Sequence, residues 1–218
     1  MLKAIIFGAP GSGKGTYSSR LEAHLGVVVI AMGDIFRKSI KENSDLGQKV
    51  KTYVEKGLLV PDEIVIEVLK QRLTKVPKDK GFILDGYPRT LDQAKILQSV
   101  VDIDVILLLD VPDWIMIERL STRRICKKCG TVYNVRFLKP KVEGICDKCG
   151  GELYQRADDT AEVIKQRLEV YLDQTKPLVE FYRLKKVPFI ESKTESLESQ
   201  PDLMVEKIIE ELKDQKFI

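Results

Sequence analysis

Five short apolar runs divide the chain, and most of the segments between them are charged with helical spacing. The runs cover residues 2–7, 27–30, 82–84, 105–109 and 187–190. Apolar runs of this length are typical of strands that are buried on both faces. Segments such as "EIVIEVLKQRL" and "WIMIERLSTRR" repeat apolar residues at helical spacing. Strands alternating with helices predict an α/β fold, with a parallel five-stranded sheet covered by helices on both faces.

Two segments interrupt this alternation and predict insertions into a single domain. A helical stretch separates the second and third runs; we expect the insertion at about residues 31–60, with helix continuing to about residue 73. The segment 125–156 holds all four cysteines, several glycines and short β-like runs such as "TVYNVRFL". With its flanking residues, this second insertion is expected at about residues 125–162.

Length and charge exclude several classes of protein. A chain of 218 residues buries a substantial core and is most simply one domain with insertions. The 36 basic residues nearly balance the 33 acidic ones, so no strong field attracts nucleic acid. The first residues lack the pattern of a signal peptide, and no run is long enough to span a bilayer. We therefore expect a cytosolic protein that binds neither nucleic acid nor membranes.

The string "GAPGSGKGT" (residues 8–16) follows the first apolar run and precedes a helix. Its glycines allow backbone N–H groups to converge on phosphate oxygens, and the helix N-terminus adds its dipole. Lys14 supplies a charge for the β- and γ-phosphates, and the Thr16 hydroxyl can bind Mg²⁺. The usual phosphate-loop pattern has Ser or Thr directly after the lysine, whereas this chain has Gly15 there.

A second string, "GFILDGYPRT" (residues 81–90), carries further phosphate chemistry. The third apolar run delivers Asp85 to the end of the sheet, where its carboxylate can hold Mg²⁺ directly or through water. Gly86 and Pro88 predict a tight turn that presents Arg89. A fixed guanidinium suits bidentate recognition of a phosphate.

Together these strings resemble the adenylate kinase branch of the nucleoside monophosphate kinases, whose loop reads GxPGxGKGT. "MGDIFR" (residues 32–37) and "GLLVPDE" (residues 57–63) match the family as well, and the resemblance runs from Met1 to about Val187. It implies a phosphate-loop fold with an acceptor-binding insertion and a lid. In "MGDIFR" we expect Asp34 to cap a helix that carries Arg37.

The resemblance also implies where AMP binds. The family has Ser-Thr before Gly-Asp, whereas Ala31 and Met32 stand here, so a hydroxyl near the acceptor base is missing. A thioether can still pack on the face of a base. The residues implied to bind AMP are Met32, Arg37, Leu59, Val60, Gly86, Arg89, Gln93, Arg156 and Arg167.

Four further arginines lie in two groups. Arg119 and Arg123 are four apart and are expected on one helix face. Arg156 and Arg167 flank "ADDTAEVIKQ", where Asp158 or Asp159 is expected to cap the helix that carries Arg167. Four guanidiniums would repel one another unless anions lay between them. Taken singly, each suits a salt-bridged surface position.

By the resemblance, these arginines clamp the phosphates during transfer, and Arg119 also stacks on the donor adenine. Lid backbone near Val132 and Tyr133 contacts the donor base. The implied catalytic residues are Lys14, Arg89, Arg123, Arg156 and Arg167. The implied ATP-binding residues are Gly11, Ser12, Gly13, Lys14, Gly15, Thr16, Arg119, Arg123, Val132 and Tyr133.

The four cysteines form two Cys-x2-Cys pairs, Cys126/Cys129 and Cys146/Cys149, separated by sixteen residues. This spacing predicts a four-cysteine zinc ribbon, in which zinc, or iron in its place, is structural because no coordination position stays open. A reducing cytosol disfavours disulfides. Zinc ribbons also bind nucleic acid or proteins, but the surrounding sequence resembles the metal-bearing lid of bacterial adenylate kinases.

The sequence therefore predicts a monomeric enzyme that catalyses Mg·ATP + AMP ⇌ 2 ADP by direct in-line transfer with lid closure. Asp85 and Thr16 would serve Mg²⁺. Ala31 and Met32 leave open a UMP or CMP kinase, and the divergent stretch 191–202 leaves open GTP as donor. A zinc-ribbon ATPase that binds nucleic acid is the alternative from another class, and the balanced charge disfavours it.

Overall fold

A central sheet of five parallel strands organises the molecule, and the computed structural model describes all 218 residues. The strands lie in the order β2 (Val28–Ala31), β3 (Phe82–Asp85), β1 (Lys3–Phe7), β4 (Val105–Asp110) and β8 (Phe189–Lys193). Each overlaps one of the apolar runs, so the predicted sheet is confirmed. Strand β1 lies in the middle, with Ile5 paired to Leu84 of β3 and Ile106 of β4.

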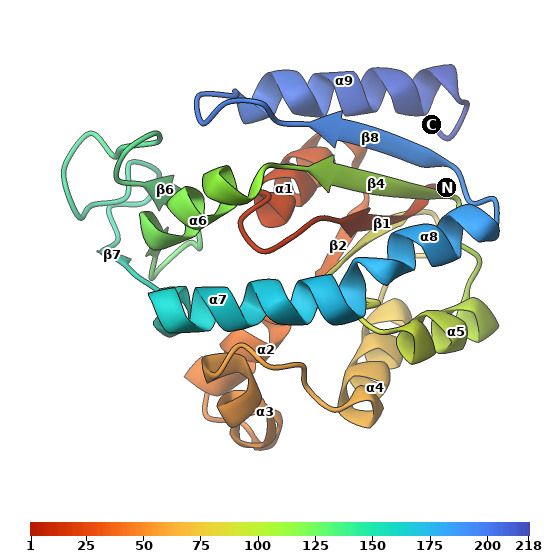
Figure 1. The fold of residues 1–218 in the computed structure, drawn as a ribbon, viewed down its shortest axis with the longest axis horizontal. Coiled ribbons are helices and arrows are strands. Elements are labelled where there is room, and N and C mark those ends of the chain that lie inside the picture. The colour runs from red at the N-terminus through yellow and green to blue at the C-terminus, as the bar shows by residue number, and fades with distance from the viewer.

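Helices cover both faces of the sheet, as predicted, and the strand residues alternate between two apolar clusters (Figure 1). On one face, α1 (Lys14–Leu25) and α9 (Pro201–Asp214) pack on Ala4 and Ile6. On the other, α5 (Leu91–Val100) and α8 (Pro177–Leu184) pack on Ile5 and Phe7. Burial on both faces explains why the strands read as continuous apolar runs. No helix combines the length and the apolar character needed to cross a bilayer.

Three helices occupy the stretch between β2 and β3: α2 (Met32–Lys41), α3 (Asp45–Glu55) and α4 (Asp62–Leu73). Helices α2 and α3 approach so closely that a Cβ at Gly47 would lie 2.1 Å from the Ser39 carbonyl oxygen. The expected capping role of Asp34 is wrong. Helix α2 begins two residues earlier, at Met32, and the Asp34 carboxylate accepts a hydrogen bond from Arg37 in the next turn.

The cysteine-bearing segment forms a small antiparallel sheet that protrudes at the left of Figure 1. It follows α6 (Asp113–Ser121) and contains β5 (Arg123–Cys126), β6 (Val132–Asn134) and β7 (Leu153–Tyr154). The expectation that Arg119 and Arg123 share a helix face is wrong. Helix α6 ends at Ser121, and Arg123 is the first residue of β5, where its backbone pairs with Asn134.

A long helical segment then runs back across the molecule. A short 3₁₀ turn (Ala157–Asp159) leads into α7 (Ala161–Val170), and a π-helical turn (Tyr171–Thr175) joins α7 to α8. The expected capping role of Asp158 or Asp159 is also wrong. Thr160 caps α7 by accepting a hydrogen bond from the Val163 N–H, which leaves both aspartates free for other contacts.

Candidate active site

The glycine-rich loop joins the end of the central strand β1 to the start of α1. Gly11 and Gly13 have left-handed φ values of 87° and 98°. A Cβ at Gly11 would lie only 2.6 Å from the Met116 carbonyl oxygen, so the loop lies directly against α6. No side chain caps the N-terminus of α1. The backbone conformation and the uncapped helix end together suit the binding of phosphate.

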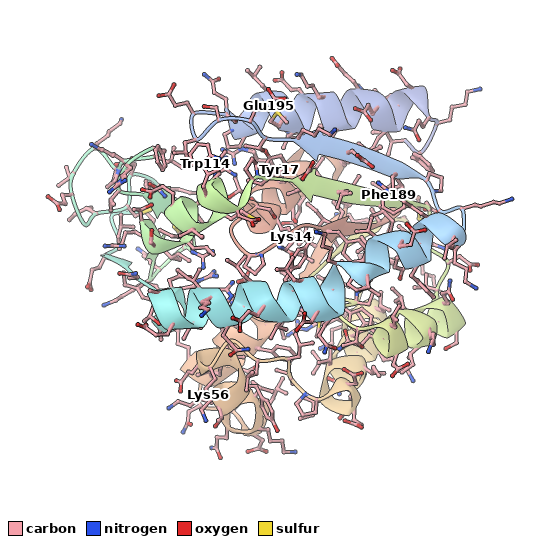
Figure 2. All side chains as sticks on the ribbon, viewed as in Figure 1. Lys14, Tyr17, Lys56, Trp114, Phe189 and Glu195 are labelled. Atoms are coloured by element: carbon pink, nitrogen blue, oxygen red, sulfur yellow. The ribbon has the colours of Figure 1, made fainter.

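Lys14, the first residue of α1, lies near the middle of the molecule, between the sheet and α7 in Figure 2. Its Nζ donates hydrogen bonds to the carbonyl oxygens of Gly8 (2.5 Å) and Ala9 (2.9 Å), which hold the ammonium at the loop. Burial lowers the pKa of Lys14 to about 8, although Asp85 opposes the shift. Lys14 is thus a buried cation beside the loop, and the chain's own groups stabilise its charge only weakly.

Asp85 ends β3 and faces the start of α1. A Cβ at Gly15 would lie 4.0 Å from its Oδ2, so the carboxylate stands across a narrow space from the loop. Burial raises the pKa of Asp85, and Lys14 counteracts the rise. A carboxylate in this position is a hard oxygen ligand beside the loop, and the residues present fit a Mg²⁺ ion that accompanies a nucleotide. Thr16 lies in the first turn of α1.

The lowered pKa of Lys14 predicts that ATP binding weakens in alkaline solution. The lysine is charged at pH 7 and loses its proton near pH 8 in the unbound protein, and the phosphates need the charged form. We expect the Kd for Mg·ATP, measured by calorimetry, to rise about tenfold from pH 7 to pH 9. Lys14→Arg should flatten this profile because a guanidinium keeps its proton; a flat wild-type profile would contradict the prediction.

Five arginines converge opposite the loop, and the chain's own carboxylates lie between them. Asp159 is the centre of the cluster, with a side chain that is fully buried. It binds Arg123 through two bonds, Nε to Oδ2 (2.8 Å) and Nη2 to Oδ1 (2.5 Å), and its Oδ1 lies 3.3 Å from Nη1 of Arg167. Asp158 accepts a hydrogen bond from the same Nη1 at 3.0 Å. The anions that lie between these arginines are therefore the chain's own aspartates.

A second part of the cluster links helix α2 to the residues after β7. Asp34 Oδ1 lies 2.6 Å from Arg37 Nη2 and 3.4 Å from Arg156 Nη2. The Nε atoms of Arg37 and Arg156 are buried without any protein acceptor. Buried donors of this kind normally have a partner, so both N–H groups can bind an oxygen atom from outside the chain, of water or of a ligand. Burial lowers the pKa of Arg156, and the neighbouring Arg37 lowers it further.

Sequence reasoning missed Asp158 and Asp159 as partners of the arginines. By pattern they are candidate helix caps, since an Asp before a helix usually serves that purpose. The available signal was their placement: two adjacent acidic residues stand between Arg156 and Arg167, and Thr160 behind them supplies a separate cap. The pattern does not show which arginine each aspartate binds, because the partners include residues more than thirty positions away, such as Arg123.

Asp159→Asn is expected to lower kcat/KM about tenfold to a hundredfold and the free energy of unfolding by about 3 kcal/mol. The buried amide no longer balances Arg123 and Arg167, so both guanidiniums lose their fixed positions. Steady-state kinetics and urea unfolding would measure the two effects. Glu162→Gln is the matched control, since Glu162 is an exposed acid in the first turn of α7. Equal behaviour of the two variants would show that these ion pairs contribute nothing.

A pocket, called the acceptor pocket below, opens beside the cluster, between α2, α3, α4 and the turn after β3. The predicted AMP-binding residues meet there, with the exception of Arg156. The pocket is lined by Met32, Gly33, Phe36, Arg37, Val54, Gly57, Leu58, Leu59, Val60, Val65, Gly86, Arg89, Gln93, Asp158 and Arg167. Arg89 is held by a hydrogen bond from its Nε to the Gly86 carbonyl oxygen (3.0 Å). The lining of the pocket thus combines three guanidiniums with a mainly apolar remainder.

The remaining donor-site predictions fall on α6 and the small sheet. Arg119 lies in the last turn of α6, one turn beyond Met116, whose carbonyl meets the loop at Gly11. Burial lowers the pKa of Arg119, and the nearby Tyr17 opposes this. Val132 and Tyr133 lie in β6, paired with β5. The Tyr133 ring is buried in the small sheet, where its hydroxyl contacts Cys146 Sγ at 3.5 Å.

The four cysteines form a compact group in the small sheet. Their sulfur atoms all lie within 4.8 Å of one another, and the cross-pair distances are 3.4 Å for Cys126–Cys149 and 3.6 Å for Cys129–Cys146. Four thiolates about 2.3 Å from one tetrahedral ion are separated by similar distances. All four are free thiols. The residues present therefore fit one metal ion with four sulfur ligands.

Fold and site together define a class, the phosphate-loop enzymes that act on nucleotides. The comparisons with known proteins specify it further. The family model described as Adenylate kinase matches residues 6–187. The chain belongs to the adenylate kinase family.

Three curated relatives, each named Adenylate kinase, show how similar the chain is to other members of the family. The relative from Caldicellulosiruptor saccharolyticus is 51% identical over 189 residues, which is 84% of this chain and 88% of the relative. That from Methanosarcina acetivorans is 46% identical over 85% of this chain and 88% of its own length. That from Thermosipho melanesiensis is 46% identical, covering 84% and 87%.

Proposed function

We propose that this chain transfers the γ-phosphoryl group of Mg·ATP to AMP and forms two molecules of ADP. The observation that carries the proposal is the position of the arginine cluster, which lies between the phosphate loop and the acceptor pocket. The curated relatives bear the name of this activity.

The proposed mechanism relies on position and charge. An AMP phosphate in the pocket lies among Arg37, Arg89 and Arg167, and the β- and γ-phosphates of ATP lie on the loop beside Lys14. An AMP oxygen attacks the γ-phosphorus in line, the bond to the β-phosphate oxygen breaks, and ADP leaves with that electron pair. No side chain forms a covalent intermediate. Arg123, Arg156 and Arg167 stabilise the charge on the group in transit.

A bound Mg²⁺ would supply further positive charge to the phosphates of ATP. Asp85 and Thr16 are the residues that would hold it, from β3 and α1 respectively. The chain's own share of the work is to fix the phosphates. Asp158 and Asp159 hold the guanidiniums in place before the substrates arrive, so the protein reorganises little during the reaction.

We include closure of the two insertions over the site in the proposal. Lys41 Nζ of α2 donates a hydrogen bond to the Lys127 carbonyl oxygen at 3.2 Å, and Asp34 of α2 lies 3.4 Å from Arg156. These contacts join the two insertions across the site, as is expected when two covers close over it. Closed covers would exclude water, which would otherwise hydrolyse the γ-phosphate. Residues 31–60 and 125–162 are the proposed covers, and a monomer leaves room for both to move.

Zinc in the cysteine site and a cytosolic location complete the proposal. A four-sulfur tetrahedral site suits Zn²⁺, with iron as the alternative. Free thiols at ligand spacing are typical of a reducing compartment. The near balance of basic and acidic residues gives no support to nucleic-acid binding.

A panel of acceptors tests the proposed function. Mg·ATP is offered with AMP, UMP, CMP, GMP or dTMP, and the products are separated by anion exchange. Rapid ADP formation only when AMP is the acceptor supports the proposal. Preference for UMP or CMP would favour the second candidate, which Met32 motivates because this buried side chain lines the pocket without offering a hydrogen bond. No transfer to any acceptor would overturn the kinase activity, and GTP in place of ATP tests the donor.

A further inference from the structure

The acceptor pocket has only one uncharged polar side chain that can read the edge of a base. Of the residues that line it, Arg37, Arg89, Asp158 and Arg167 belong to the phosphate cluster, and Gln93 is the only other one with a hydrogen-bonding side chain. The rest of the wall is glycine and apolar residues such as Met32, Phe36 and Val65. A base that enters the pocket therefore meets a single side-chain amide.

The Gln93 amide is held in one orientation by two groups with opposite demands. Its Oε1 accepts a hydrogen bond from the Arg89 backbone N–H at 2.7 Å, and its Nε2 donates to Asp62 Oδ1 at 2.6 Å. A backbone N–H can only donate, and an ionised carboxylate can only accept. A 180° flip of the amide would set N–H against N–H and oxygen against oxygen, so the flipped state loses both bonds.

Asp62 is itself fixed by the start of α5. Its Oδ2 lies 3.3 Å from the Thr90 Oγ1, and that hydroxyl caps α5 by accepting from the Gln93 backbone N–H at 3.2 Å. Residues from α4 and from the turn before α5 therefore form one closed network around the amide, and Gln93 is 1% exposed. The amide has one N–H and one oxygen lone pair left for a ligand.

The orientation of an amide decides which base it recognises. Adenine and cytosine present an amino group beside a ring-nitrogen acceptor, which Oε1 and Nε2 of one amide can match together. Hypoxanthine, guanine and uracil present a carbonyl oxygen beside a ring N–H, and they need the amide flipped. A freely flipping glutamine accepts both patterns, whereas a locked one rejects the second.

We propose that Asp62 is a specificity-determining positioning residue: its carboxylate locks the Gln93 amide so that the acceptor site selects amino-bearing bases over keto-bearing ones. This inference rests on the proposed function. The locked amide would also distinguish the two pyrimidine acceptors, because CMP shares the amino pattern and UMP does not. The test uses AMP and inosine monophosphate, which differ only at the edge in question.

Asp62→Asn replaces the carboxylate by an amide of the same shape, which can donate as well as accept. The flipped Gln93 then keeps a partner at position 62, and only the Arg89 backbone N–H still opposes the flip. We expect the ratio of kcat/KM for AMP to that for inosine monophosphate to fall at least about tenfold. The matched control is Glu63→Gln, which removes an exposed carboxylate from the same first turn of α4 and should leave the ratio unchanged.

A double variant separates positioning from a structural role. In a Gln93→Leu background, Asp62→Asn should have no further effect on the ratio, because no amide remains to be oriented. Equal losses for AMP and inosine monophosphate in Asp62→Asn, or the same shift in the Gln93→Leu background, would overturn the inference. If wild-type protein is active on AMP, either outcome leaves the proposed function intact. A wild type without activity on any acceptor would overturn the proposed function itself.

Discussion

Replacing Lys14 by methionine is expected to lower kcat/KM about a thousandfold without lowering stability. In the proposed mechanism the ammonium is the cation that the glycine-rich loop presents to the phosphates, and the carbonyls of Gly8 and Ala9 hold it there. A loss of this size corresponds to about 4 kcal/mol of transition-state stabilisation, as expected for a charge aimed at the transferring group. Stability should stay equal or rise, because burial lowers the pKa of Lys14 and so disfavours its charged form.

A coupled assay for ADP and urea unfolding would measure both quantities on one preparation. Lys51→Met is the matched control, since Lys51 is an exposed lysine of α3 with a distant partner, Glu55, at 3.9 Å. Its activity and stability should equal those of the wild type. If the Lys14→Met variant kept more than a tenth of the activity, the prediction would be wrong, and the phosphates would have to bind elsewhere than on this loop.

Removing the metal from the four cysteines is expected to unfold the lid (residues 125–162) while the central sheet stays folded. The only buried apolar cluster of the small sheet consists of Cys126, Tyr133 and Cys146, and two of these three belong to the proposed metal site. A cluster of this size cannot hold a sheet by itself, whereas a structural zinc contributes on the order of 10 kcal/mol in small domains. Since Arg123 begins β5, catalysis should fall at least about tenfold as well.

Metal analysis should first find about one zinc per chain. After treatment with a thiol-displacing mercurial and a chelator, limited trypsin digestion should cut at lid lysines such as Lys141 and Lys148, and the remainder of the chain should stay protected. Reducing agent followed by added Zn²⁺ should restore resistance and activity, which excludes irreversible damage. Full activity and trypsin resistance in metal-free protein would show that the cysteines need no metal to hold this fold.

The glycine-rich loop shows what can be predicted from the local sequence alone. Its glycines, Lys14 and the uncapped start of α1 lie within a few residues of one another, so spacing along the chain is also spacing in the structure. The cysteine site was predictable for a similar reason. Each Cys-x2-Cys pair brings two sulfur atoms together locally, and only the meeting of two such pairs needs the tertiary structure.

The helix caps predicted from the local sequence pattern are wrong. Asp34, Asp158 and Asp159 each satisfy the sequence pattern of a cap, but Ala31 and Thr160 occupy those positions. Ion pairs between partly buried groups outweigh the single backbone hydrogen bond that a cap forms, and their partners come from distant segments. The cap pattern cannot show that Asp159 binds Arg123, which lies 36 residues earlier.

The sequence by itself determined the parallel sheet, the phosphate loop and the sulfur ligands, because burial on both faces, backbone freedom at glycine and short ligand spacing are all local properties. Only the tertiary structure decided how the charges are paired and how the Gln93 amide is turned. Asp62 reaches Gln93 across 31 residues, and Asp158 and Asp159 sit among arginines that come from α2, β5 and α7. Charge pairs act over a few ångströms in space, whatever their separation along the chain, so their partners are set by packing and not by pattern.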